Sequence, residues 1–224
     1  MERKFNFSVD EYYHVFSRGV DRREIFSDKE DRERFLRLLY ITNSSKSVRF
    51  TEISRLPYPL MERGEPLAAV GAYCLMPNHF HLLLRETEEN GISSFMKKLL
   101  TSYSMYFNKK NDRTGNLFES TFRAEHVDGD NYLKYLFAYI HLNPIKLIDS
   151  EWKKKGIINK KLAKEYLSSY EYSSYFEYTG KERDESLILC AKEFPEYFGN
   201  IHDFRDFINY WLTYRKEVDS IIQG

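Results

Sequence analysis

The chain has 224 residues, in which 34 basic residues balance 34 acidic ones, and 17% of the residues are aromatic. The zero net charge argues against a protein that binds nucleic acid without specificity. It has no run of 18 or more apolar residues, and residues 1–10 are too charged for a signal peptide, so we expect no membrane partner. Cys74 and Cys190 fall in an apolar predicted strand and an apolar predicted helix, which indicates buried free thiols and a cytoplasmic protein.

The first part of the chain predicts strands and a helix in alternation. Residues 11–17 have the β-branched and aromatic character of a strand. Residues 27–30 match a capping box, and apolar side chains at helical spacing follow them. Residues 43–66 contain several Pro, Gly and Ser residues and predict a loop. Residues 67–76 are apolar on both faces and predict a central strand.

A hairpin and two further helices are predicted next. The turn at Pro77 leads into a second strand over residues 79–85. A helix begins at Gly91, a strand lies within residues 119–127, and another helix ends at Pro144. The order strand, helix, strand, strand, helix, strand, helix predicts an α+β fold with an antiparallel sheet covered by helices.

The chain changes character after Asp149. Residues 186–192 predict a short helix, and residues 203–222 have a clear amphipathic period. We therefore expect residues 1–149 to form one domain and residues 150–224 to form a helical C-terminal extension packed on it.

The most informative feature is the pair His79 and His81 on the second strand of the predicted hairpin. Side chains two residues apart on a strand point to the same face, so both imidazoles project together while Phe80, Leu82 and Leu84 enter a core. Two imidazoles on one face make half of a site for a divalent cation. Such pairs also arise by chance, and the spacing alone does not decide for a metal.

Tyr139 and Asn143 are four residues apart on a predicted helix, so they share one helix face. A histidine pair with a tyrosine and an amide oxygen favours phosphoryl transfer with a phenolic nucleophile. A core aromatic residue would have the same spacing as Tyr139, and Tyr135, one turn earlier, is the competing nucleophile. His14, on the first predicted strand, is interpreted as structural.

Basic residues gather in two places. Residues 97–123 hold six basic and two acidic residues, a net charge of +4, with aromatic residues between them. Such a stretch suits contacts with the phosphates and bases of DNA, and an ordinary solvated surface is the alternative. The candidate DNA-binding residues are Lys97, Lys98, Lys109, Lys110, Arg113 and Arg123 in this stretch, with Arg18, Arg22 and Arg23 in a smaller cluster.

Four ordered motifs resemble the single-tyrosine HUH transposases of bacterial insertion sequences, and especially the REP-associated tyrosine transposases. The motifs are YHVFSRG with RREIF at residues 13–26, YCLMPNHFHLL at 73–83, TGNLFESTFR at 114–123 and YIHLNPIK at 139–146. A further segment, EYSSY at 171–175, is similar to one that follows the last motif in the family. The resemblance covers about residues 10–180 of the chain.

This resemblance implies a ferredoxin-like fold and a metal-dependent enzyme that cleaves and rejoins single-stranded DNA beside hairpins through a 5′-phosphotyrosine intermediate. Carried over residue by residue, His79, His81 and Asn143 would bind Mg²⁺ or Mn²⁺, and Tyr139 would be the nucleophile. The implied partner is single-stranded DNA with a hairpin, of the REP or insertion-sequence type. Family analogy also allows a homodimer.

Two departures from the family pattern bear on DNA recognition. Leu147 and Ile148 stand where the family often has a small residue and glycine, and the loop at residues 43–66 is longer than usual. Two other functions fit the same residues: a non-catalytic DNA-binding protein derived from such an enzyme, and a metal phosphodiesterase in which water attacks. A covalent protein–DNA adduct would separate the three.

Overall fold

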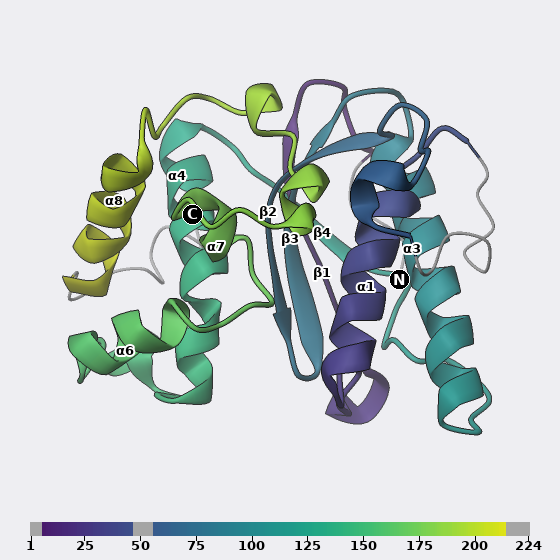
Figure 1. Ribbon diagram of the computed structural model, residues 1–224, viewed down its shortest axis with the longest axis horizontal. Helices are drawn as coiled ribbons and strands as arrows, with labels where there is room; N and C mark the ends of the chain where they lie inside the picture. The colour runs from purple at the N-terminus through teal and green to yellow at the C-terminus, as the bar shows by residue number, and fades with distance from the viewer. Residues whose placement is uncertain (1–5, 47–55, 214–224) are drawn as a thin grey trace.

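The computed structural model describes residues 6–46 and 56–213. Its strands are β1 (Tyr12–Arg18), β2 (Ala68–Met76), β3 (His79–Glu86) and β4 (Arg123–His126). They form one antiparallel sheet in the order β2-β3-β1-β4, with helices on both sides (Figure 1). Within the described ranges, none of the helices combines the length and the apolar character needed to cross a membrane.

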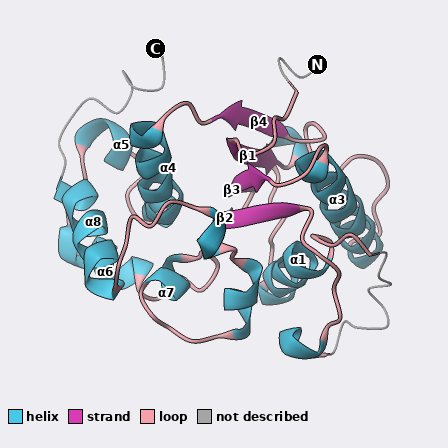
Figure 2. Ribbon diagram, turned by 90° about the horizontal axis from the view of Figure 1, so that it is seen from above, coloured by secondary structure: helices cyan, strands magenta, loops and turns pink. Residues whose placement is uncertain are grey.

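The helices form one layer on each side of the sheet. Helices α1 (Lys29–Ile41) and α3 (Gly91–Lys110) cover one face, and α4 (Asp130–Leu142) covers the other (Figure 2). The order β1, α1, β2, β3, α3, β4 is that of the ferredoxin-like fold, and α4 follows it. The expected α+β fold and its order of elements are therefore confirmed.

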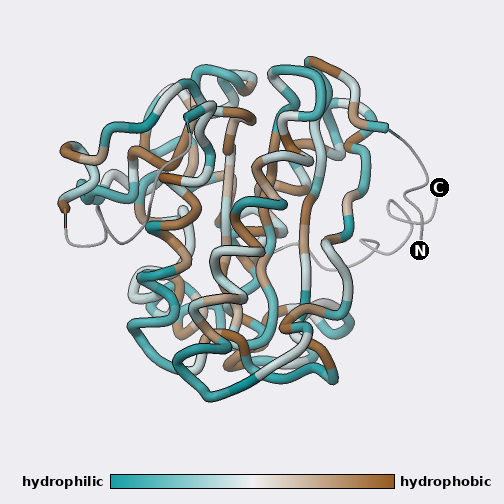
Figure 3. The backbone as a smooth tube through the Cα atoms, turned by 90° about the vertical axis from the view of Figure 1, so that its right-hand side faces the viewer, coloured by the Kyte–Doolittle hydropathy of each residue, from teal (hydrophilic) through white to brown (hydrophobic). Residues whose placement is uncertain are grey.

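Alternate residues of β3 enter two different cores. Phe80, Leu82 and Leu84 are fully buried among side chains of α1 and α3, whereas Leu83 packs with α4. Figure 3 shows hydrophobic segments running through the middle of the molecule and hydrophilic ones gathered in the outer loops. Because side chains alternate along a strand, His79 and His81 lie on the α4 face, opposite to Phe80.

The rest of the described chain packs around α4. Its helices are α5 (Trp152–Lys155), α6 (Lys160–Leu167), α7 (Tyr175–Tyr178) and α8 (Ile201–Thr213). A third core joins Leu142 of α4 to Leu167, Phe204 and Ile208. Fully buried His141 adds a polar link, since it donates from Nδ1 to the Phe137 carbonyl at 2.8 Å and accepts from the Ser174 hydroxyl at Nε2 at 2.7 Å. Burial lowers the pKa of His141 to about 3, so this imidazole is neutral.

The C-terminal segment, residues 150–213, also covers the outer edge of β2. Its backbone bonds to β2 through Tyr172, Ser174 and Cys190, which pair with Leu75, Tyr73 and Val70. The hydroxyls of Tyr170 and Tyr178 donate to the carbonyls of Leu75 and Gly71. The sheet edge is thus completed by a segment far away in the sequence.

Short 3-10 turns connect these elements. They are Val20–Arg22, Tyr58–Leu60, Asn143–Leu147, Asp184–Ile188 and Ala191–Glu193. The last two replace the helix predicted over residues 186–192, because the Cys190 N–H is bonded to Val70 on β2 instead of to a helical carbonyl. Cys190 is therefore half-buried outside a helix, while Cys74 is buried as expected; both are free thiols.

Two other predicted boundaries change. The N-cap of α1 is Asp28 rather than Ser27, and its side chain accepts from the Asp31 N–H at 2.9 Å. The strand predicted within residues 119–127 is regular over Arg123–His126, and single backbone bonds from Glu119 and Val127 to β1 lie on either side of it. The predicted loop at 43–66 and the amphipathic segment at 203–222 lie partly outside the described residues, as does the charged stretch at 1–10.

Candidate active site

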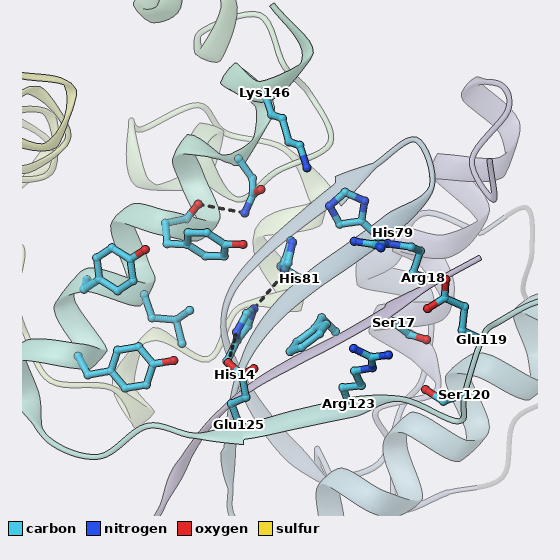
Figure 4. A pocket seen from close by; sticks show the side chains of 16 residues that line it. His14, Ser17, Arg18, His79, His81, Glu119, Ser120, Arg123, Glu125 and Lys146 are labelled. Atoms are coloured by element: carbon cyan, nitrogen blue, oxygen red, sulfur yellow. Dashed lines mark hydrogen bonds and ion pairs between the residues drawn. The ribbon is translucent and has the colours of Figure 1, made fainter. Parts of the chain in front are cut away.

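A pocket of about 410 Å³ opens between the β1–β3–β4 side of the sheet and the face of α4 that carries Tyr132, Tyr135 and Tyr139 (Figure 4). Its lining includes His79 and His81 from β3, with Tyr139 and Asn143 from α4 and the turn that follows it. The Tyr139 ring lies edge-on to the His81 ring, with centroids 5.4 Å apart. The structure therefore brings the predicted nucleophile and the three predicted metal ligands into one pocket.

His79 stands at the start of β3, directly after the turn at Pro77. Its Nδ1 is 2.6 Å from the Asn78 side-chain oxygen, while the Asn78 amide nitrogen donates to the Arg22 carbonyl at 3.1 Å. The second bond fixes which way the Asn78 amide faces. Because an amide oxygen only accepts, the His79 proton lies on Nδ1 and the lone pair of the neutral ring lies on Nε2.

His14 on β1 lines the same pocket, although the sequence placed it among structural residues. Its Nε2 is 2.8 Å from His81 Nδ1, and the two rings stack with centroids 5.0 Å apart. Its Nδ1 faces Glu125 of β4 at 3.5 Å. The sequence of β1 indicates this position, because His14, Phe16 and Arg18 alternate with residues that face the core and so lie on the pocket side.

The charges around His14 also affect Tyr132 of α4. The hydrogen bond with His14 lowers the pKa of the Glu125 carboxyl, so Glu125 is ionised at neutral pH. Burial, followed by the nearby Glu125 charge, raises the pKa of Tyr132 to about 12. Tyr132 therefore keeps its proton and is a poor nucleophile.

Tyr135 and Tyr139 have different neighbours. Tyr135 is 5% exposed and packs edge-on against Trp211 of α8, with ring centroids 5.4 Å apart. Tyr139 is half-buried, and its ring meets the rings of both His14 and His81. Of the two competing tyrosines, Tyr139 is the one beside the imidazoles.

Asn143 is the C-cap of α4 and is 1% exposed. Its amide nitrogen donates to the Tyr139 carbonyl at 3.1 Å, which leaves the side-chain oxygen as the acceptor that the residue brings to the pocket. Among the described residues, no group of three or more His, Cys, Asp or Glu side chains is arranged to hold a metal ion. The predicted donors are instead two imidazoles and one amide oxygen, all from residues that line the pocket.

Cations surround the pocket mouth from three elements. Arg18 of β1, Arg123 of β4 and Lys146 from the turn after α4 all line it. Figure 4 shows Lys146 reaching towards His79 from one side and Arg18 lying beside His79 from the other. Sequence reasoning assigned no role to Lys146, although it lies in the quoted motif at residues 139–146.

The basic residues of α3 lie on the far side of the sheet from this pocket (Figure 2). Lys98 donates to the Ser44 carbonyl at 2.7 Å, and Lys110 is paired with Asp28 and Asp31. The structure thus separates the predicted DNA-binding set into three groups. These are Arg18 and Arg123 at the pocket, Arg22 and Arg23 at the turn after β1, and Lys97, Lys98, Lys109, Lys110 and Arg113 on and after α3.

The fold and the pocket define a ferredoxin-like α+β protein with a histidine–tyrosine site. Residues 67–143 match the family model described as "Transposase IS200 like", and this segment contains both histidines, Tyr139 and Asn143. The match confirms the resemblance to IS200-like transposases that the motifs indicate.

One solved structure similar to this chain is described as "Structure of the REP associates tyrosine transposase bound to a REP hairpin". It is 12% identical, and the similarity covers 83% of this chain and 90% of that chain with a TM-score of 0.49. No curated protein matches the chain.

Proposed function

We propose that this protein is a metal-dependent transposase that nicks and rejoins single-stranded DNA beside hairpins, with Tyr139 as the nucleophile. The observation that carries the proposal is the meeting of Tyr139 with His79, His81 and Asn143 in one pocket. The family match over the segment that contains these residues supports it.

The two imidazoles and the Asn143 oxygen would hold Mg²⁺ or Mn²⁺ and leave positions for water and phosphate oxygens. When bound, such an ion polarises the scissile phosphate and offsets the charge that develops during transfer. The chain's own contribution is to present neutral imidazole nitrogens whose lone pairs can bind the cation. For His79 the contact with Asn78 leaves the lone pair on Nε2.

Tyr139 would attack the phosphorus of the bound strand. The bond between the phenolic oxygen and phosphorus forms while the bond to the 3′ oxygen breaks, and that oxygen leaves as a 3′-hydroxyl after taking up a proton. Since free tyrosine has a pKa of about 10, the phenol must lose its proton as it attacks. The 5′-phosphotyrosine keeps the phosphodiester energy, so rejoining to a new 3′-hydroxyl needs no ATP.

The proposed partner is single-stranded DNA flanked by a REP-like or insertion-sequence hairpin. Arg18, Arg123 and Lys146 at the pocket mouth suit its phosphates, since cations supply most of the affinity in such complexes. Every group in the proposal comes from one chain, so the homodimer that family analogy allows is not needed to complete the site.

The test uses end-labelled hairpin DNA with single-stranded flanks, incubated with Mg²⁺ or Mn²⁺ and run on denaturing gels. The parent protein should cleave the DNA and form a covalent adduct. Tyr139→Phe removes one oxygen and keeps the ring, so it should bind DNA normally and lose cleavage and adduct together.

Tyr135→Phe is the matched control, one helical turn away on the same face, and it should keep the adduct. An adduct that persists in Tyr139→Phe would assign the nucleophile elsewhere, first to Tyr135. Cleavage without an adduct in the parent protein would identify water as the nucleophile, and binding without cleavage would favour the non-catalytic alternative.

A further inference from the structure

We propose that His14, oriented by Glu125, is a positioning residue that holds His81 in the tautomer protonated at Nδ1, so that Nε2 carries the lone pair offered to a cation. The inference rests on the proposed function in one respect, because the proposed function is what makes His81 a metal ligand. The arrangement of the two rings is independent of that assignment.

The contact between His14 Nε2 and His81 Nδ1 is 2.8 Å long and holds one proton between two nitrogens. If His81 donates, its own lone pair is on Nε2, as a metal ligand requires. If His14 donates, the His81 proton must sit on Nε2, and that nitrogen cannot bind a cation. The direction of this one hydrogen bond therefore decides whether His81 can be a ligand.

Glu125 selects the first direction. A carboxylate only accepts, and Glu125 Oε2 lies 3.5 Å from His14 Nδ1, so the His14 proton belongs on Nδ1. The Nε2 atom of a neutral His14 must then accept from His81. His14 and Glu125 are direct partners across the β1–β4 pairing, so the register of the sheet sets this contact.

The surroundings keep the two rings in this relation. His14 and His81 are each only 6% exposed, and their rings stack at an angle of 23°. Phe16 packs against both rings, with centroids within 6 Å. A hydrogen bond between two buried rings is stronger than the same bond in water, which favours a fixed tautomer.

His79 shows the same arrangement reached by different means. Its Nδ1 donates to Asn78, whose amide is itself oriented by the Arg22 carbonyl. Both imidazoles of the pair thus have an acceptor at Nδ1, one from a turn and the other from a neighbouring strand. Ligating histidines in proteins are usually held in this way through the nitrogen that does not bind the metal.

The chain offers a matched control, a pair between β4 and the residue that directly precedes β1. His126 of β4 bonds through Nε2 to Glu11 at 2.8 Å, next to the His14–Glu125 pair but away from the pocket lining. If His14 merely contributed a surface-type His–Glu pair to stability, His14 and His126 variants would behave alike.

The first measurement is ¹⁵N–¹H NMR of the full chain labelled at histidine, without metal and at a pH where the rings are neutral. The parent should show His81 protonated at Nδ1. His14→Phe should give a mixture of tautomers. His14→Gln should keep the parent pattern, because the Glu125 carboxylate takes the amide N–H of Gln and leaves the amide oxygen to accept from His81. Glu125→Gln should also give a mixture, because an amide can accept from His14 or donate to it, and His126→Phe should change nothing.

The second measurement is Mn²⁺ affinity, read by electron paramagnetic resonance. His14→Phe should bind about 10- to 100-fold more weakly, in the range found when the partner of a ligating histidine is removed. His14→Gln and His126→Phe should stay close to the parent. Circular dichroism checks folding, and since Glu125 is exposed, Glu125→Gln keeps the test available if His14→Phe does not fold.

A parent protein with His81 protonated at Nε2 would overturn the inference, as would unchanged Mn²⁺ affinity in His14→Phe. A parent that binds no Mn²⁺ would overturn it together with the metal step of the proposed function. Normal tautomers and Mn²⁺ binding without any DNA adduct would instead refute the proposed function and leave the role of His14 intact.

Discussion

The face of the sheet under α1 and α3 and the face under α4 are made by the same strands, yet they carry different side chains. The first presents buried apolar residues, among them Val15, Phe80 and Leu82. The second is apolar only where α4 covers β2 and β3, around Cys74 and Leu83, and becomes polar towards β1 and β4. Because α4 packs closely on only part of this face, the pocket can form over the part made by β1, β4 and the start of β3.

Neighbouring residues of β3 therefore contribute to different properties, one to stability and the other to the pocket. Phe80 stabilises the core under α1 and α3, whereas His81 faces the pocket. Substitutions on the α1 and α3 face should therefore reduce stability, whereas substitutions on the α4 face should reduce activity.

The largest effect is expected for His81→Ala, which should reduce DNA cleavage to background. The variant lacks one of three proposed ligands, so it loses both charge neutralisation and phosphate placement. Gel assays across a Mn²⁺ titration measure this, with thermal unfolding run alongside. Full cleavage by His81→Ala or His79→Ala would refute the metal role of the pair.

Phe80→Ala should instead destabilise the protein by about 3–5 kcal/mol, as expected when a fully buried aromatic side chain is removed. Urea unfolding gives the free energy, and cleavage should persist under conditions in which the variant is folded. His79→Ala, at a half-buried position, is the control in the same unfolding assay. Equal destabilisation by the two variants would contradict the division between the faces.

DNA affinity should depend more on the pocket cations than on those of α3. The double variant Arg123→Ala with Lys146→Ala should weaken binding and lower the salt slope by about 1.4, at about 0.7 per lost phosphate contact to a single strand. Joint replacement of Lys109, Lys110 and Arg113 is the comparison, measured at several salt concentrations. A larger loss from that triple variant would place the main DNA contacts on the α3 side.

The smallest effect is expected for Asp28→Asn on α1. Asn is also a good N-cap, so the substitution removes chiefly the charge that pairs with Lys110, which at an exposed position is worth about 0.5 kcal/mol.

The effect should also depend on pH. The hydrogen bond from Lys110 holds the pKa of Asp28 below its ordinary 3.8, so its charge stabilises the fold above that value. The difference in unfolding free energy between parent and variant should therefore vanish as the pH falls through the lowered pKa. A difference that persists in acid would mean that the cap, not the charge, has been damaged.

Local patterns in the sequence predict much of the fold. The alternation of apolar residues around His79 and the turn at Pro77 place both imidazoles on one face, and the spacing of Tyr139 and Asn143 places them on one side of α4. These are relations between residues close in the chain, for which helix and strand periodicity is a sufficient guide.

Relations between distant strands could not be predicted in the same way. His14 and Glu125 join the pocket only because β1 lies between β3 and β4, and no spacing within one strand reveals that neighbour. The basic residues of α3 belong to the same basic stretch of sequence as Arg123, but α3 packs on the opposite face of the sheet. The candidate site could therefore be outlined from motifs, while its supporting residues required the order of the strands.

The covered edge of β2 has a consequence for aggregation. An exposed strand edge offers N–H and carbonyl groups with which another chain can pair. Here Tyr172, Ser174 and Cys190 occupy those groups through their backbone, and two tyrosine hydroxyls cap further carbonyls. Proteolysis that removed the C-terminal segment would expose the edge of apolar strand β2, which could then pair with other copies of the protein. Protection against such association thus resides in a segment that supplies none of the described residues lining the pocket.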